Sequence, residues 1–486
     1  MRSSADPAPS ALPLGSTRVN ETVVTMPVSR RQPGGDVPRS PARSVQEIFA
    51  SDAKPPPAVL LIDSPRDMGR DDVSLDRYYS REWHEREVRT VWQKTWQMAC
   101  RVEDIPEVGD SEVYEIVHDS LIIVRTGPAE TDIRAYVNSC LHRGTILRTE
   151  PGNLRHIKCP VHGITWGLDG KLAGLPCAWD FPQVDREKFC LPEARVGVWA
   201  GFVFINFDQD CEPLETYLEC LPEHYKAFNT ENRYKAIHGG KILPCNWKLA
   251  QEAFMEGYHI AMTHPQSVEY TADTNTQYDV FDGRHVSRFV MPEGVASPAL
   301  GNYPQQKIVD AMRRDMAFYS RADITVGEGE TARERIADHA RARVSKATGR
   351  DFSNQSTSES IDLIQYFLFP NLGPWAGMST PLVYRFRPNG DNPEECIMEI
   401  MMLFAKNADG THPPVGRPTI VGLHDSWHKV PGMGSAADVT DQDTENLKRI
   451  QRGIRASKKP GATMSVYQES RIRHFHKTLE AYMAKG

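Results

Sequence analysis

The sequence of 486 residues predicts an α+β protein in which a β-rich module precedes a larger domain that mixes helices and strands. Short apolar runs of strand type, such as 121–124 and 202–205, lie among glycines and prolines between 98 and 208. From 209 onward, segments with helical periodicity alternate with further strand-like runs. The length also exceeds what one hydrophobic core usually organises, which favours two domains.

The expected elements follow the chain in four parts. Residues 1–70 are rich in proline, serine, alanine and arginine without apolar periodicity, so we expect a largely disordered N-terminal extension. Residues 71–97 should form a helical lead-in that packs with the last domain, with Ser80 as a helix cap. Residues 98–208 form the β module and residues 209–486 the α+β domain. In the latter we expect helices over 213–228, 247–264, 305–320 and 441–457, and strands over 363–369, 381–387 and 396–405.

The composition excludes several classes of protein. A net charge of -7 with 25% charged residues provides no basic field for nucleic acid. No stretch approaches the roughly 20 apolar residues that span a bilayer, and the N-terminus lacks the apolar core of a secretory signal. We therefore expect a cytoplasmic protein that acts on small molecules, away from membranes. Nine cysteines, an odd number, favour metal ligation over a disulfide framework.

Two similar loops in the β module each offer one thiolate and one imidazole: Cys140 with His142, and Cys159 with His162. A closed tetrahedral zinc site is the alternative, but zinc motifs more often pair like ligands within each half. In a Rieske 2Fe-2S cluster two cysteines bind one iron and two histidines bind the other, which suits two mixed loops. A glycine follows each loop and allows backbone amides to approach the cluster, and the turn at 168–171 resembles a hairpin.

A second pair of histidines, His259 and His264, is separated by five positions. On a regular helix of 3.6 residues per turn they would point about 140° apart, so they converge only if the helix widens or ends. Pro265 supplies a reason for the helix to end. The alternative is that one of them is a buried core histidine, and the cluster motif upstream favours a metal site instead.

These motifs carry a family resemblance. From about Tyr78 to the C-terminus the sequence resembles the α, or catalytic, subunit of Rieske non-haem iron aromatic ring-hydroxylating oxygenases. Besides the two cysteine loops, the matching motifs stand in the family's order: Tyr78 to Glu82, Asn246 to Lys248, Glu252 to His259 and Phe369 to Asn371. Val161 and Ile164 depart from the aromatic residues that are frequent at these places in the family.

The resemblance implies an all-β Rieske domain followed by a helix-grip-like α+β catalytic domain with an antiparallel sheet. It implies a mononuclear Fe²⁺ held by His259, His264 and a carboxylate near the start of a downstream helix, an arrangement that leaves positions open for dioxygen. We assign that carboxylate to Asp443. Asp441 and Glu445 are the rivals, because acidic residues are common in a first helical turn.

The resemblance also gives Glu256 a role between the two metal centres. Most family members have aspartate there, and in their trimers this carboxylate joins a cluster histidine of one subunit, here His162, to an iron histidine of the next, here His259. The chain lacks a dinucleotide fingerprint, so we expect a separate NAD(P)H-dependent reductase with or without a ferredoxin, a homotrimer, and possibly a β subunit.

The substrates implied are dioxygen and an apolar or aromatic small molecule, and the reaction is dioxygenation, monooxygenation or demethylation. We expect the pocket to be lined by the helix around Phe254 and Met262 and by strands 363–369 and 398–404. A non-enzymatic Rieske electron-transfer protein is the main alternative, and a zinc-stabilised binding protein is a more distant one. The set of His259, His264 and a carboxylate argues against both.

Overall fold

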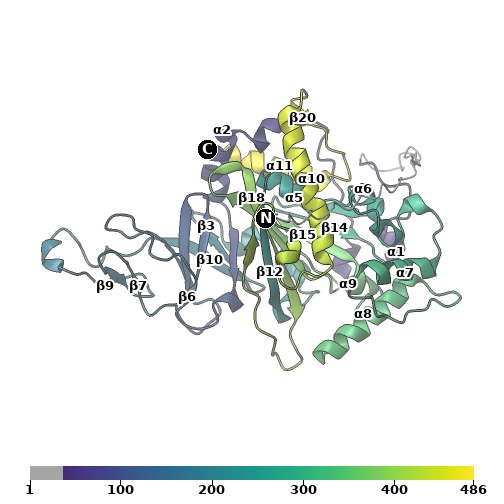
Figure 1. Cartoon of the computed structure of the whole chain (residues 1–486), viewed down its shortest axis with the longest axis horizontal. Helices are drawn as coiled ribbons and strands as arrows, with labels where there is room; N and C mark the ends of the chain where they lie inside the picture. Colours follow the sequence, from purple (N-terminus) through teal and green to yellow (C-terminus); the bar gives the residue numbers. More distant parts are fainter. Residues whose placement is uncertain (1–36, 379, 486) are drawn as a thin grey trace, which may run out of the picture.

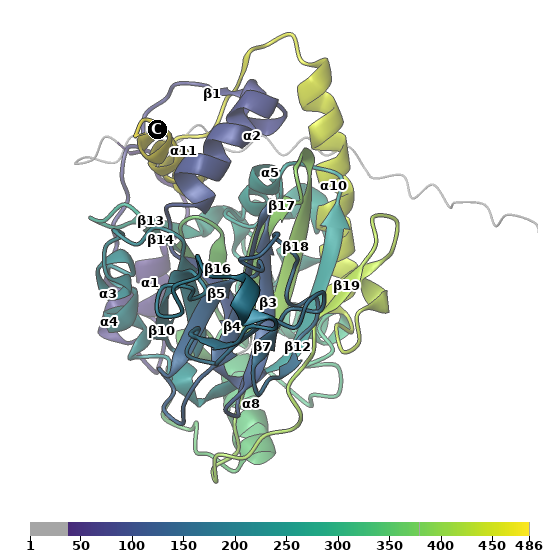
Figure 2. The same ribbon diagram turned by 90° about the vertical axis from the view of Figure 1, so that its left-hand side faces the viewer.

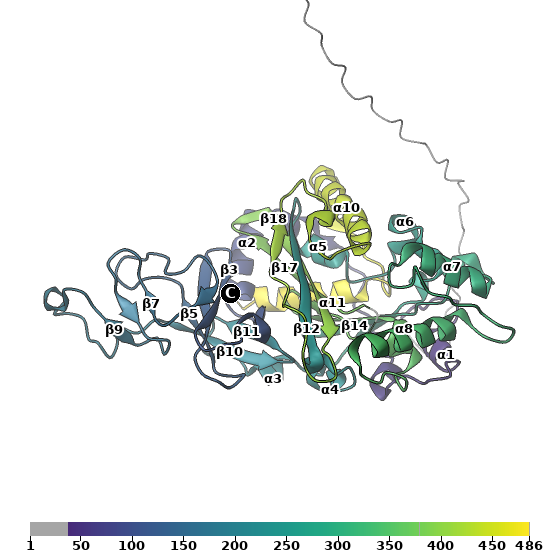
Figure 3. The same cartoon turned by 60° about the horizontal axis from the view of Figure 1, so that its bottom comes forward.

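The computed structural model describes residues 37–378 and 380–485. Within these ranges no helix is both long and apolar enough to cross a membrane. The molecule is elongated, with a β module at one end and helices α7 (Gln305–Asp315) and α8 (Ala332–Thr348) at the other (Figure 1, Figure 3). This arrangement is the mixed α+β class expected from the sequence.

The β module contains a seven-stranded antiparallel sheet and a three-stranded sheet at its tip. In the large sheet, apolar runs are buried on both faces. Along β4, Leu121 and Ile123 enter one core while Ile122 and Val124 enter another, because successive side chains of a strand point to opposite faces. The large sheet has the order β2 (Gln97–Arg101), β11 (Phe202–Asn206), β10 (Glu193–Trp199), β5 (Ile133–Val137), β4 (Asp119–Arg125), β3 (Asp110–Ile116), β6 (Gly152–Asn153), and the tip holds β7 (Ile157–Lys158), β8 (Thr165–Trp166) and β9 (Leu172–Gly174).

The α+β domain is built on an eight-stranded sheet in which all neighbours are antiparallel except β12 and β19. Helices α5 (Trp247–Glu252), α10 (Ala436–Ala456) and α11 (Ser470–Met483) pack on one face of it (Figure 1). The sheet has the order β13 (Gln277–Val280), β14 (Val286–Met291), β15 (Leu363–Leu368), β16 (Leu372–Pro374), β17 (Leu382–Asn389), β18 (Asn392–Ala405), β12 (Arg233–Leu243), β19 (Thr419–Val421).

The helices differ from the sequence expectation in two places that shape the site. The expected helix 247–264 is interrupted: α5 ends at Glu252, and α6 (Ile260–Thr263) is a separate short helix. Helix α11 was not expected, although Ile472, Phe475 and Leu479 repeat at helical spacing and are all buried. It packs beside the lead-in helix α2 (Arg81–Glu87), as Figure 2 shows. The side chain of Ser80 caps the first turn of α2, as predicted.

Part of the N-terminal extension is ordered rather than disordered. Residues 1–36 lie outside the described residues, but helix α1 (Val45–Phe49) and the turn at 58–61 are folded. Val45, Phe49 and Leu60 are buried in one core with residues of both domains. The few apolar side chains of this segment therefore cover apolar surface of both domains. The spacing of apolar residues in the segment does not reveal such a long-range contact.

Candidate functional site

The two cysteine loops at the tip of the β module have the same backbone design. Cys140 N–H donates to the Thr145 carbonyl, and Cys159 N–H donates to the Ile164 carbonyl, each at 2.8 Å. In each loop the glycine four residues on donates back to the cysteine carbonyl, and Gly144 and Gly163 have φ of 78° and 75°. Only glycine adopts this left-handed backbone without strain, so both loops require it.

The four predicted cluster residues are brought together by these loops. Cys140 and Cys159 are buried and their thiols interact electrostatically, while the rings of His142 and His162 have centroids 4.8 Å apart. Burial raises the pKa of the Cys140 thiol, whereas for Cys159 the amides of Val161 and His162 outweigh burial and lower its pKa. Amides that favour thiolates suit a site for a metal cluster.

The surroundings of the second loop contain the expected hairpin turn. The turn at 168–171 joins β8 to β9, with Gly167 N–H donating to the Lys171 carbonyl at 2.9 Å. Ile164 is buried, whereas Val161 is 53% exposed.

A second cluster of ligand-type residues lies in the α+β domain. His259, His264 and Asp443 each offer one ligand atom, and these atoms all lie within 4.8 Å of one another. Asp443 Oδ1 is 2.8 Å from His264 Nε2 and 3.6 Å from His259 Nε2. A compact set of two imidazoles and one carboxylate fits a divalent iron with open coordination positions.

The backbone explains how histidines five positions apart converge. His259 precedes the single turn of α6, and His264 leaves the helix with φ -124° and ψ 59°. The helix thus ends before Pro265, which is one of the two possibilities considered from the sequence. Asn446 on α10 donates to Thr263 at 3.2 Å and ties the end of α6 to the helix that carries Asp443.

Asp443 is the carboxylate that reaches the histidines, and its rivals have other contacts. It lies in the second turn of α10, which begins at Ala436, rather than at the helix start as expected from the resemblance. Asp441 accepts from the Trp427 amide at 3.1 Å and from Lys241 at 3.5 Å. Glu445 is largely exposed and pairs only loosely with Arg449, at 3.8 Å.

Two side chains orient the imidazoles through Nδ1, the ring nitrogen that does not face Asp443. Glu256 Oε1 lies 2.7 Å from His259 Nδ1, and its Oε2 accepts from the His259 amide at 3.0 Å. Although burial opposes it, the Glu256 carboxylate raises the pKa of His259, with a smaller contribution from Asp443. Gln442, which sequence reasoning missed, accepts from His264 Nδ1 at 2.7 Å; its position beside Asp443 was the available signal. Such partners fix the orientation of ligand imidazoles.

A cavity of about 330 Å³ opens beside the second site. Glu256, His259 and Asp443 line it together with Tyr78 and Glu252. In the same pocket region Tyr78 donates to Glu252 at 3.0 Å. Through this cavity, the side of the metal site that carries Glu256 is accessible from the protein surface.

Of the two helix residues expected to line the substrate pocket, Phe254 lies in the interior and Met262 does not. The Phe254 ring lies 4.9 Å from that of Tyr384 on β17, on the sheet face that the helices cover. Met262 is 88% exposed and points to solvent, because α6 is one isolated turn with only its Ile260 side buried.

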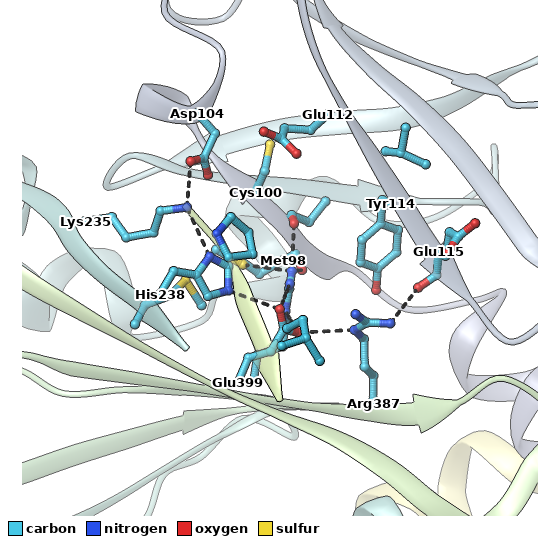
Figure 4. A pocket seen from close by; sticks show the side chains of 16 residues that line it. Met98, Cys100, Asp104, Glu112, Tyr114, Glu115, Lys235, His238, Arg387 and Glu399 are labelled. Atoms are coloured by element: carbon cyan, nitrogen blue, oxygen red, sulfur yellow. Dashed lines mark hydrogen bonds and ion pairs between the residues drawn. The ribbon is translucent and has the colours of Figure 1, made fainter. Parts of the chain in front are cut away.

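The β module joins the catalytic sheet through a buried polar network (Figure 4). Lys235 on β12 donates to Asp104 at 2.6 Å and contacts His238 at 3.2 Å. His238 Nε2 in turn lies 3.1 Å from the Glu399 carboxylate. Arg385 donates two N–H groups to the same carboxylate, at 2.8 and 2.7 Å. The network surrounds a cavity of about 180 Å³ between the two domains. It fixes the position of the β module on the α+β domain.

Comparison with known proteins gives two family matches. Residues 95–185 match the Rieske 2Fe-2S domain, and residues 217–485, more than half of the chain, match the ring hydroxylating α subunit catalytic domain. The chain is 32% identical over 203 residues to the chlorobenzene dioxygenase subunit α of Cupriavidus sp. (strain PS12), covering 40% of this chain and 44% of that protein. It is 27% identical over 215 residues to the glycine betaine monooxygenase oxygenase subunit of Pseudomonas aeruginosa (strain UCBPP-PA14), covering 44% and 48%. The matched segments thus span less than half of these relatives.

Solved structures share the fold over most of the chain. The quaternary ammonium Rieske monooxygenase CntA in complex with L-carnitine has a TM-score of 0.59 at 17% identity, covering 85% of this chain and 95% of that chain. Naphthalene 1,2-dioxygenase with indole bound has a TM-score of 0.58 at 17% identity, covering 86% and 93%.

Proposed function

This chain belongs to the α subunits of the Rieske non-haem iron ring-hydroxylating oxygenases, and from that membership we propose that it oxygenates a small organic molecule at the site of His259, His264 and Asp443. The observation that supports the proposal best is the convergence of these three side chains within 4.8 Å, in a chain that also carries two mixed cysteine and histidine loops.

The residues fit both metal groups. Two adjacent buried thiols and two neighbouring imidazoles suit a Rieske 2Fe-2S cluster at Cys140, His142, Cys159 and His162. Two imidazoles and one carboxylate suit a mononuclear Fe²⁺ at the second site. When bound, the cluster supplies electrons and the Fe²⁺ supplies a place for dioxygen to react. The protein holds the ligands: Glu256 and Gln442 fix the two imidazoles, and Asn446 holds the end of α6.

The position of the two sites supports electron transfer between copies of the chain. The strands of the cluster tip, β7 and β9, and helix α6 beside the second site lie toward opposite ends of the molecule (Figure 1, Figure 3). We infer a homotrimer in which the cluster tip of one subunit meets the cavity at Glu256 of the next. His162, exposed at the tip, would face the Glu256 carboxylate there. Glutamate reaches one methylene further than the aspartate of most relatives.

The partners follow from the same chemistry. The chain needs an external source of electrons, which we assign to a separate NAD(P)H-dependent reductase with or without a ferredoxin. The fold is also compatible with a β subunit, and co-purification of a second protein with this chain would identify one. The substrate is an organic small molecule, and both aromatic compounds and quaternary ammonium compounds are named among the relatives.

Iron content and electron dependence test the proposal. An oxygenase requires about three irons per chain, an electron carrier two, and a zinc protein none. The purified chain with a reductase and NADH should consume dioxygen in the presence of substrate, and should not turn over repeatedly with NADH alone. Two irons per chain after anaerobic Fe²⁺ reconstitution, with no dioxygen uptake, would support the carrier instead.

A further inference from the structure

Arg471 is a buried cation that contacts the loop carrying the second metal site. It is the second residue of α11, and it is 0% exposed. Its Nη1 donates to the carbonyl of Met255, the residue before Glu256, at 2.9 Å and to Gln365 Oε1 at 3.0 Å. Its Nε donates to the hydroxyl of Ser287 at 3.2 Å. All of these acceptors are neutral.

The remaining nitrogen, Nη2, has no acceptor among the residues that the structure describes. The two other arginines among the largest fully buried side chains both have a carboxylate: Arg101 pairs with Glu103 at 2.7 Å and Arg288 with Asp279 at 2.6 Å. Burial lowers the pKa of Arg471 to about 9, and the smaller opposing effects of Tyr278 and Asp279 do not offset it. Buried charges are normally paired, so this one points to a ligand.

A row of aromatic rings connects Arg471 with the metal site. The guanidinium carbon of Arg471 lies 5.0 Å from the centre of the Phe289 ring. Ring centres are then 5.6 Å apart from Phe289 to Trp375, 5.8 Å from Trp375 to Tyr384 and 4.9 Å from Tyr384 to Phe254. Phe254, at the far end of the row, is two residues before Glu256, whose carboxylate lies 2.7 Å from Nδ1 of the metal ligand His259.

Trp375 contributes a second donor without an acceptor. Its indole N–H is buried and unpartnered among the described residues, and its ring contacts the same Phe289 that lies under Arg471. Gln365, which accepts from Arg471, forms an isolated β-bridge with Trp375. Two N–H donors without an acceptor among the described residues therefore lie at one end of the aromatic row, and Phe254, in the segment that leads to His259, lies at its other end.

We propose that the substrate of this oxygenase carries a carboxylate that binds Arg471, while the aromatic row holds its apolar part toward His259, His264 and Asp443. The inference rests on the proposed function and narrows its substrate class. Charge-assisted hydrogen bonds from arginine to carboxylate are among the strongest available, and they strengthen in a site from which water is excluded. A neutral substrate of the same shape leaves the buried cation unpaired, so the site discriminates against it.

Equilibrium binding to the holoenzyme tests this without turnover. Anaerobic treatment with nitric oxide gives the mononuclear iron an electron spin signal that shifts when a ligand binds beside it. The probes are carboxylates matched with their amides: benzoate with benzamide, 3-phenylpropionate with 3-phenylpropionamide, and 4-trimethylammoniobutyrate with its amide. We expect at least one carboxylate to bind ten-fold or more tightly than its amide. Equal binding within every pair, or no binding by any carboxylate, would overturn the proposal.

Variants then assign the preference to Arg471. Arg471→Gln should reduce it to two-fold or less, whereas Arg449→Gln, at an exposed position on α10, should keep it. If Arg471→Gln loses the cluster absorption, the variant is misfolded and Arg471→Lys replaces it in the test. In Arg471→Lys the affinity for the carboxylate should fall at least five-fold while the affinity for the amide stays unchanged. An unchanged affinity for the carboxylate would refute the role of Arg471. A wild-type protein without the nitric oxide signal would contradict the proposed function itself, which is a separate outcome.

Discussion

Glu399 offers a direct test of the network that joins the two domains. It is 2% exposed and accepts from Arg385, Arg387 and His238, the longest of these contacts being 3.2 Å. Glu399→Gln keeps the shape of the side chain but removes the charge and turns one oxygen into a donor that faces other donors. Breaking a buried ion pair from one side costs about 3–5 kcal/mol. For a domain of this size that corresponds to about 6–20 °C in the unfolding midpoint.

The pH dependence of this effect has a defined sign. Burial opposes ionisation, but Arg385 and Arg387 hold the pKa of Glu399 well below its usual range. A carboxylate with a depressed pKa in the folded state stabilises the protein above its ordinary pKa of about 4.3, and this contribution is lost as the pH falls toward the folded value. The difference between wild type and Glu399→Gln should therefore be full at neutral pH and shrink in acid.

The assay is thermal unfolding followed by tryptophan fluorescence and by the visible circular dichroism of the cluster. Glu223→Gln is the matched control, since Glu223 forms an exposed ion pair with Lys226, and it should leave the midpoint unchanged. If Glu399→Gln unfolds within 2 °C of wild type, or if the difference persists unchanged in acid, the network does not hold the domains together as described.

Three further predictions concern the metal sites. Asp443→Ala should remove the mononuclear iron and all oxygenation while the cluster absorption stays intact, whereas Glu445→Ala should bind iron like wild type. Metal analysis of the two variants tests this, and iron loss in Glu445→Ala but not in Asp443→Ala would mean that the wrong carboxylate was chosen. Cys140→Ser should abolish the visible absorption and electron spin signal of the cluster, because a 2Fe-2S unit needs all four ligands, and an unchanged spectrum would refute the assignment. Glu256→Gln should keep the cluster and most of the iron but slow single-turnover cluster oxidation by about 10- to 100-fold, with partial recovery in Glu256→Asp; oxidation at the wild-type rate would show that electrons cross elsewhere.

The local sequence predicted features that depend on neighbours in the chain. The two cysteine loops, the glycines that close them and the turn at 168–171 are short segments whose residue types dictate their backbone, and the structure contains them as expected. Three strands of the catalytic sheet, β15, β17 and β18, were also predicted, because apolar runs that are buried on both faces leave a clear signal.

Longer-range features could not be predicted in the same way. The choice of Asp443 over Asp441 and Glu445 rested on family resemblance and not on local sequence, because all three lie on one helix. Only the packing of α10 against α6 selects the residue that meets the histidines. Met262 was expected in the pocket, but the break between α5 and α6 turns it to solvent.

Arg471 shows the limit most clearly. Its helix had a readable periodicity, yet nothing in the sequence marks a buried arginine as paired or unpaired, because its potential partners lie more than 100 positions away in the chain. Local sequence sets which groups are present and how the nearby backbone turns. Which charges face one another is decided by tertiary packing, since electrostatic and hydrogen-bond energies depend on distances between side chains that only the assembled core brings together.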